Sequence, residues 1–328
     1  MQTEFSRTLG IQVPLICGAM YPCSNPELVA AVSEAGGIGI VQPLSLTYVH
    51  GYDFREGLRY IRSLTRKPIG VNFIIERSSK KYLARVHQWV DISLEEKVPF
   101  FVTALGNPRW VVDKANSTGT IIYHDVTNRK WAEKALDGGV DGFICVNNRA
   151  GGHAGELSPQ ELLSEVAPLG KPLICAGGIG EPEEFAGAIK AGYVGAQLGT
   201  RFLASTECSV GSDYKEAILR AHEDDIVLTE KISGVPVSII RTPYIDRIGT
   251  RAGPVAKWML GGRKTKHWMR TIYSLQSIWK LKQASLQGGG HKDYYQAGKS
   301  VAGIGEILPV ANIMEDFASA LETRMKNT

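Results

Sequence analysis

The chain has 328 residues, of which 44% are hydrophobic and 21% charged, with a formal net charge of +4. This composition excludes a disordered chain, and the length allows one large domain or two ordinary ones. No run of about 18 apolar residues occurs, so we expect no membrane-spanning helix, and the mild charge gives no case for a nucleic-acid partner. The start, MQTEFSRTLG, lacks the apolar stretch of a secretory signal, and the five cysteines form no CxxC pair. We therefore expect a cytoplasmic protein with reduced, mostly buried thiols.

Short apolar runs, each followed by a turn signal and a helical pattern, recur along the first two-thirds of the chain. They predict eight strands, at Pro14–Gly18, Gly37–Gln42, Pro68–Phe73, Pro99–Ala104, Thr120–His124, Gly142–Asn147, Pro172–Ala176 and Val194–Leu198. The runs do not alternate between apolar and polar residues, which is typical of strands in a parallel sheet buried on both faces.

Helix-start signals lie between these strands. Helices are expected to begin at Asn25-Pro26, at Thr127, at Ser158-Pro159 and at Glu181-Pro182. Most of these pairs join a capping side chain to a proline in the first turn. The spacing of strand and helix, roughly 20–32 residues, is long enough for right-handed crossovers. Eight such units predict an α/β fold of the closed (β/α)8 TIM barrel type rather than an open doubly wound sheet.

A barrel of this kind needs about 250 residues, so a surplus remains after the eighth strand. We expect residues 1–220 and 301–328 to form the barrel, and residues 221–300 to form a mostly helical, basic insertion packed on it. The insertion holds eight lysines and arginines and no acidic residue between Ala252 and Lys292. A solvated helix over Lys257–Gln287 is the simplest interpretation, and a docking surface for an acidic partner is the alternative. A closing helix is expected at Pro309–Arg324.

Two glycine-rich segments follow the seventh and eighth predicted strands, where barrels commonly bind phosphate. They are Ala176-Gly177-Gly178 and Gly199-Thr200. Glycines let backbone N–H groups approach an anion, and the start of a following helix adds partial positive charge. Either segment alone could be a simple tight turn, but both together at the expected strands favour a phosphate site.

The segment after the sixth predicted strand places His153 among three glycines and two alanines. A histidine in such an open setting can take a proton from a carbon acid or donate one; a hydrogen bond within its own loop is the structural alternative. The pair His124-Asp125, after the fifth strand, is a rival acid–base site, although Asp125 could instead belong to the helix entry. No His, Cys, Asp and Glu residues have metal-ligand spacing, so we expect no metal.

Small and amide side chains end two further strands. Gly18 and Ala19 would let a flat ring lie against the backbone, Met20 offers a polarizable contact, and the Asn72 amide can both donate and accept a hydrogen bond. A core methionine and a turn asparagine are the structural alternatives. With a phosphate site across the same mouth, these residues suggest a phosphorylated heteroaromatic ligand. FMN fits, and so would a nucleotide or a sugar phosphate.

Seven segments together resemble the nitronate monooxygenase family, formerly called 2-nitropropane dioxygenases, and its sister, the FMN-dependent enoyl-ACP reductases. They are PLICGAM, NPELVAAVSEAGGIG, GVNF, AGGHAG, PLICAGGI, GAQLGTRF and YYQAGKSVAGI, in this order. The resemblance implies non-covalent FMN, with His153 abstracting a proton from the α-carbon of the substrate. The cofactor residues that it implies are Gly18, Ala19, Met20, Asn72, Gly152, Ala176, Gly177, Gly178, Gln197, Gly199 and Thr200.

The same resemblance implies a reaction, in which a small alkyl nitronate or nitroalkane is oxidised with O2 to a carbonyl compound and nitrite. The alternative is an NAD(P)H-dependent FMN reductase acting on quinones or on enoyl-ACP, with the basic segment docking the acyl carrier protein. A third hypothesis is a non-catalytic barrel that only binds a phosphorylated ligand. Relatives usually have a glycine and an acidic residue before AGGH, where this chain has Asn147 and Arg149. A cation there would favour an anionic substrate such as a nitronate.

Overall fold

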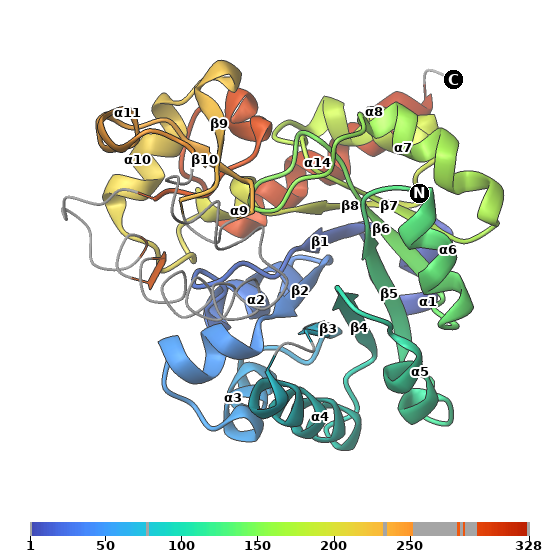
Figure 1. Ribbon diagram of the computed structural model, residues 1–328. Coiled ribbons are helices and arrows are strands. Elements are labelled where there is room, and N and C mark those ends of the chain that lie inside the picture. The colour runs from blue at the N-terminus through green and yellow to red at the C-terminus, as the bar shows by residue number, and fades with distance from the viewer. Residues whose placement is uncertain are drawn as a thin grey trace.

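The computed structural model describes residues 2–76, 79–231, 235–251, 281–282, 285 and 294–326. Within these residues, eight parallel strands form a closed barrel in chain order, with helices between them (Figure 1). The strands are β1 (Leu15–Cys17), β2 (Ile38–Val41), β3 (Ile69–Ile74), β4 (Phe100–Ala104), β5 (Ile121–Val126), β6 (Gly142–Val146), β7 (Leu173–Ala176) and β8 (Gly195–Leu198). The ring closes between β1 and β8, where Ile16 lies opposite Gln197. The TIM barrel predicted from the sequence is therefore confirmed.

The four helices whose starts were predicted between the strands begin at or within two residues of the predicted positions. The longer helices of the described chain are α1 (Glu4–Leu9), α2 (Pro26–Glu34), α3 (Phe54–Leu64), α4 (Lys80–Glu95), α5 (Arg109–Ala115), α6 (Arg129–Asp137), α7 (Pro159–Val166), α8 (Pro182–Ala191), α10 (Ser212–Arg220), α11 (Pro243–Ile248) and α14 (Val310–Lys326). Short ones are η1 (Ser45–Val49), η2 (Ala167–Leu169), α9 (Thr200–Leu203), η3 (Glu223–Asp225) and η4 (Lys299–Gly303). One cap was wrong: Asn128, not Thr127, has the extended backbone before α6, and its side chain accepts from the Trp131 N–H.

Residue alternation along the strands produces two hydrophobic clusters. The inner cluster fills the barrel and includes Ile16, Phe100, Tyr123 and Ile174. Phe5 of α1 joins it at the N-terminal end of the strands, with ring centroids 5.6 Å from those of Phe100 and Tyr123. The interior is therefore packed solid, and ligands can approach only the carboxyl ends of the strands.

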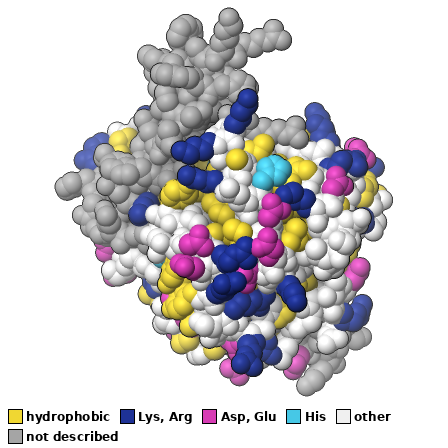
Figure 2. Space-filling model, turned by 90° about the horizontal axis from the view of Figure 1, so that it is seen from below, with side chains coloured by type: hydrophobic (Ala, Val, Ile, Leu, Met, Phe, Trp, Pro, Cys, Tyr) yellow, Lys and Arg dark blue, Asp and Glu magenta, His cyan; other side chains and the backbone are white. Residues whose placement is uncertain are grey.

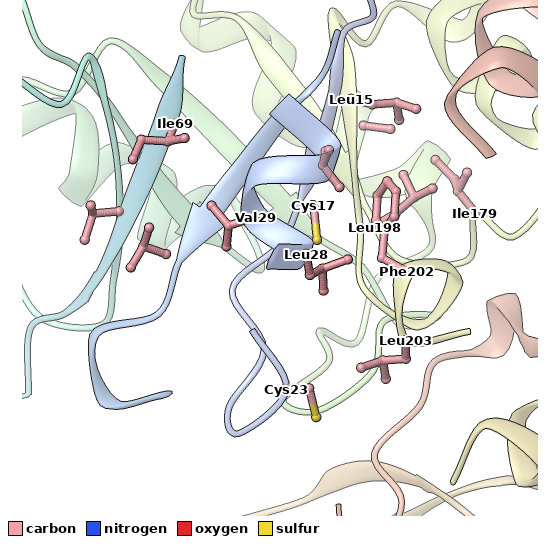
Figure 3. Packing of buried hydrophobic residues seen from close by; sticks show 14 of the residues in the cluster. Leu15, Cys17, Cys23, Leu28, Val29, Ile69, Ile179, Leu198, Phe202 and Leu203 are labelled. Carbon is pink, nitrogen blue, oxygen red and sulfur yellow. The ribbon is translucent and has the colours of Figure 1, made fainter. Parts of the chain in front are cut away.

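The outer cluster lies between the barrel and its helices. Figure 3 shows side chains from β1 (Leu15, Cys17), α2 (Leu28, Val29), β8 (Leu198) and α9 (Phe202, Leu203) gathered in it. The helix α2 approaches β2 so closely that a Cβ at Gly39 would lie 2.2 Å from the Val29 carbonyl oxygen. This approach requires glycine on the strand.

The described part of the insertion contains an antiparallel strand pair that the sequence analysis did not anticipate. β9 (Ile226–Thr229) pairs with β10 (Val237–Ile240). Both segments are rich in β-branched residues, a signal that could have revealed them. The expected helix over Lys257–Gln287 and the glycines after it lie outside the described residues, apart from positions 281, 282 and 285.

The closing helix is confirmed as α14, which packs on α8 and α2. On the face formed by α3, α4 and α5, basic and acidic side chains lie side by side (Figure 2). There, Arg55 pairs with Glu95 and Glu96, and Arg59 pairs with Glu96. This face therefore lacks the one-sign field that nucleic acid requires. In the part of the chain that the structure describes, no helix combines the length and apolarity needed to cross a membrane.

Candidate active site

The barrel topology brings the predicted site residues to one end, because the carboxyl ends of all eight strands open at the same mouth. Contacts between β1 and β8 are direct. A Cβ at Gly18 would lie 3.0 Å from Gln197 Cγ, and one at Gly199 would lie 3.3 Å from Met20 Sδ. The residues expected along a flat ring and those expected at a phosphate are therefore neighbours.

Backbone conformation and close packing require glycine at both positions after β7, apart from any role in anion binding. Both have positive φ, +119° at Gly177 and +77° at Gly178. A Cβ at Gly177 would lie 2.5 Å from Asn147 Oδ1, and one at Gly178 would lie 2.4 Å from Arg149 Nε. Asn147 Nδ2 also donates to the Gly177 carbonyl at 3.0 Å. The loop after β6 is thus seated directly on the β7 loop.

A segment near the C-terminus joins this mouth. The Gly298 N–H donates to Thr200 Oγ1 at 3.0 Å, and the Lys299 N–H donates to the Arg149 carbonyl at 2.9 Å. Thr200 is buried, and its hydroxyl proton remains available for a second acceptor. No residue of this segment was predicted in the site. Gly298, in the chain Gln296-Ala297-Gly298, was the signal that could have pointed to it.

His153 lies on the β6 loop, and its side chain is exposed. Surrounding protein nevertheless desolvates the ring and lowers its pKa below the ordinary histidine value. The ring is thus flanked by protein although its side chain reaches solvent. The uncharged ring, which can accept a proton, is therefore the favoured form near neutral pH.

The backbone beside His153 is held by the insertion. The Ser238 N–H of β10 donates to the Gly152 carbonyl at 2.7 Å, and the Gly152 N–H returns a longer bond of 3.4 Å. Within the loop, the Gly155 N–H donates to the Asn147 carbonyl at 3.1 Å. His153 thus lies in a loop that is held by a backbone hydrogen bond of its own and by backbone hydrogen bonds to β10.

The remaining predicted ring contacts lie on β1 and β3. Asn72 is buried on β3, and its Nδ2 makes only a long contact of 3.5 Å to the Val102 carbonyl. Ala19 packs against the inner hydrophobic cluster. Both are therefore at the floor of the mouth.

The rival pair His124-Asp125 is split by the strand alternation of β5. His124 is buried, its Nδ1 lies 2.8 Å from Thr103 Oγ1, and desolvation lowers its pKa to about 4. Asp125 shares the inner face of the barrel with Tyr123, because alternate residues point the same way. The two side chains therefore do not act as one acid–base unit.

Arg149 does not offer a free cation at the rim. Its Nη1 and Nη2 donate to the two carboxylate oxygens of Glu223 at 2.9 and 3.0 Å, and Lys299 reaches the same carboxylate at 3.3 Å. Its charge thus ties the β6 loop to η3 and η4. The geometry gives no support to the expectation that this cation selects an anionic substrate.

Comparison with known proteins identifies the class of enzyme. The family model described as nitronate monooxygenase matches residues 2–319. The chain belongs to the nitronate monooxygenase family. The resemblance found in the sequence is thereby confirmed, and the protein is a flavin-dependent oxidoreductase.

The relatives and structural neighbours of this chain differ in the activities for which they are named. A nitronate monooxygenase of Paraburkholderia phytofirmans is 29% identical, covering 69% of this chain and 73% of its own. The (3aS,4S,5R,7aS)-5-hydroxy-7a-methyl-1-oxo-octahydro-1H-indene-4-carboxyl-CoA dehydrogenase of Rhodococcus jostii is 25% identical, covering 96% and 94%. FabK from Thermotoga maritima has a TM-score of 0.82 at 29% identity, covering 100% and 98%.

The residues of this nitronate monooxygenase homologue fit a flat, phosphorylated cofactor. Gly18 and Gly199 leave spaces that a Cβ would fill, and the neighbours of those spaces are side chains rather than backbone. A buried carboxyl oxygen, Asp125 Oδ1, has no hydrogen-bond partner among the described residues. Such an unsatisfied group is unfavourable in a bare protein and is satisfied when a polar ligand sits beside it.

Proposed function

We propose that this protein is an FMN-dependent oxidoreductase that oxidises alkyl nitronates, with His153 removing the α-proton when the substrate is a neutral nitroalkane. The observation that carries the proposal is an exposed imidazole at the barrel mouth whose desolvation favours the uncharged, proton-accepting form. The C–H bond beside a nitro group is acidic enough for such a base. The substrate is thus a small molecule, and O2 is the co-substrate.

The cofactor would be held by residues from five strand ends, those of β1, β3, β6, β7 and β8. Gly18, Ala19, Met20, Asn72 and Gln197 would contact the ring, Gly152 would line the site, and Ala176, Gly177, Gly178, Gly199 and Thr200 would surround the phosphate. When bound, FMN would supply the electron acceptor for the oxidation, and O2 would take the electrons onward. The chain itself orients the substrate and moves the proton.

Substitution of His153 tests the proposal with two substrates of different charge. The purified protein should be yellow and should turn over 2-nitropropane aerobically without NAD(P)H. His153→Asn should retain the flavin and lower the rate on the neutral nitroalkane by roughly two to four orders of magnitude. The preformed nitronate is the matched control, because its α-proton is already gone, and its rate should fall far less. An unchanged rate on the neutral nitroalkane removes His153 from the mechanism.

A second candidate is an oxidoreductase acting on an acyl thioester. Two relatives that span nearly the whole chain, from Rhodococcus jostii and Mycobacterium tuberculosis, are named dehydrogenases of a substituted octahydro-indene-4-carboxyl-CoA, which is a thioester. The α-C–H bond of a thioester is also acidified, so His153 could serve the same role. The alternative from the sequence is a reductase, with NAD(P)H as the donor and enoyl-ACP, also a thioester, or a quinone as the acceptor. Rapid anaerobic bleaching of the flavin by NADH or NADPH would favour it, and no bleaching favours the nitronate oxidase.

A further inference from the structure

Asp125 is placed inside the barrel by the register of β5. Tyr123, two residues earlier, belongs to the inner cluster, so Asp125 points to the same side. It lies opposite Ile144 of β6, one residue before the end of its own strand at Val126. The carboxyl group is therefore on the inner wall at the end of the barrel that opens to ligands.

Nothing in the described protein explains a carboxylate at this position. The helix α6 is capped by Asn128, so Asp125 has no role at the helix entry. Its Oδ1 is buried and has no hydrogen-bond partner in the part of the chain that the structure describes. An ionised carboxylate left unpaired in this setting is strongly unfavourable, whereas a neutral acid is tolerated.

The neighbouring strands do not supply a compensating charge. The inward residues beside Asp125 are Val102 and Ala104 on β4, and Ile144 and Val146 on β6, all uncharged. The helix α6 packs on the outer face of the barrel, and His124 points to that same outer face. The adjoining β6 loop carries three titratable side chains, Arg149, His153 and Glu156. Arg149 is already paired with both carboxylate oxygens of Glu223, and Glu156 is exposed.

We propose that Asp125 is a ligand-contacting residue of the barrel mouth, which in its neutral acid form donates a hydrogen bond to an acceptor atom at the edge of the bound flavin. The inference rests on the proposed flavin site and adds a second proton-carrying group to it. Burial raises the pKa of this carboxyl from 3.8 to about 7, so about half of these groups hold the proton at pH 7 and most hold it at pH 6. An O–H donor suits the carbonyl and ring-nitrogen acceptors of a heteroaromatic edge, and a carboxylate would repel them.

Flavin affinity as a function of pH tests this role without any turnover. The dissociation constant of FMN is measured by flavin fluorescence at pH 6 and pH 8.5. For the unaltered protein, we expect the constant to rise roughly 30-fold over this interval beyond any change intrinsic to FMN, because only the neutral acid binds well. Asp125→Asn keeps a donor at every pH, so its affinity should match the unaltered protein at pH 6 and exceed it roughly 30-fold at pH 8.5.

A matched control uses the same substitution at the other end of the barrel. Asp141 accepts from the Ile122 N–H at 2.8 Å just before β6 begins, and Asp141→Asn should follow the pH dependence of the unaltered protein. A second measurement needs no variant. Calorimetry in two buffers should show that binding of one FMN takes up nearly one proton at pH 8.5 and little at pH 6, after correction for the ionisation of free FMN. Riboflavin is the control ligand for this measurement.

The outcomes separate this inference from the proposed function. Equal pH dependence in the unaltered protein and Asp125→Asn, or affinity that increases with pH, overturns the role of Asp125 alone. The expected pH dependence without turnover of any nitroalkane or nitronate supports Asp125 and overturns the proposed reaction. Failure to bind FMN at either pH overturns both.

Discussion

At the scale of single residues, desolvation acts on two acid–base groups at the barrel mouth and favours the uncharged form of each. It lowers the pKa of His153 and raises that of Asp125 to about 7. Near neutral pH the imidazole is therefore mainly uncharged and able to accept a proton, and a substantial share of the carboxyl groups still holds a proton to donate in a hydrogen bond. The pKa of His153 is expected to affect the pH profile of the reaction rate, and that of Asp125 the pH dependence of stability, so the two effects can be measured separately.

The lowered pKa of His153 predicts the pH profile of nitroalkane oxidation. The uncharged ring is the active base, so the rate is lost only when pH falls through the folded pKa. We expect kcat/KM for 2-nitropropane to stay level to a pH below the ordinary histidine midpoint of about 6.5 and then to fall. The preformed nitronate should lack this fall. A midpoint well above 6.5 would contradict the assignment.

The raised pKa of Asp125 predicts a pH-dependent stability difference for Asp125→Asn. The unfolded state loses this proton near pH 3.8 and the folded state near pH 7, so rising pH removes stability across that window. The variant lacks this loss, so its advantage should grow from near zero at pH 4 to at most about 4 kcal/mol above pH 7. Urea unfolding of the flavin-free proteins at pH 5 and pH 8 measures it. A constant difference would show that Asp125 titrates normally.

At the scale of elements, the β6 loop depends on partners distant in the sequence. The Arg149–Glu223 pair joins it to η3 with two hydrogen bonds. We expect Glu223→Gln to lower the free energy of unfolding by about 1 kcal/mol, because the pair is partly exposed but bidentate. Glu216→Gln is the control: it breaks the more exposed Arg220–Glu216 pair of α10 and should cost less than about 0.5 kcal/mol. Equal losses would mean that the bidentate pair does not hold the loop.

The contact between α2 and β2 predicts opposite effects for two glycine substitutions. Gly39→Ala would force its methyl group to within 2.2 Å of the Val29 carbonyl oxygen and should destabilise the fold by about 3 kcal/mol or more. Gly187→Ala lies within α8, where an added Cβ meets nothing within 4 Å, and should stabilise by about 0.5–1 kcal/mol. Thermal unfolding of both variants measures this. Stabilisation by Gly39→Ala would show that the helix can move away from the strand.

The local sequence patterns predicted the eight strands. They also predicted that Gly177, Gly199 and His153 follow the carboxyl ends of the seventh, eighth and sixth strands. They could not predict the pairing of Gly152 with Ser238, because contacts between residues so far apart leave no periodic signal. They attributed the β7 glycines to an anion site or to a tight turn, whereas the contact of Asn147 and Arg149 with these glycines becomes visible only in three dimensions. The sequence offered a helix entry as the alternative role of Asp125 because Thr127 was taken as the cap of α6, whereas the cap is Asn128.

At the scale of the whole molecule, the proposed cofactor should stabilise the fold through binding alone. Because a ligand that binds only the folded state adds RT ln(1 + [L]/Kd), FMN at 100 times its dissociation constant should add about 2.7 kcal/mol. The Tm of flavin-free protein should therefore rise by a few degrees. Riboflavin is the control, since it lacks the phosphate and should raise the Tm less at equal concentration. No shift with FMN would contradict the flavin site.

The order of the eight βα units was predictable because each unit repeats the same local pattern of an apolar strand, a turn and a helix. The insertion was not, since its described strands, β9 and β10, pair with each other and then reach back to the β6 loop. Composition indicated basic residues in the insertion, but it did not indicate that the strand β10 would pair with the loop after β6.

The bond between Ser238 and Gly152 runs from main chain to main chain, so it does not depend on which side chains either segment carries. Mutation could therefore rewrite the surroundings of the mouth, and with them the preferred substrate, while the histidine keeps its place. The different activities named for relatives of this chain are an expected product of such tolerance.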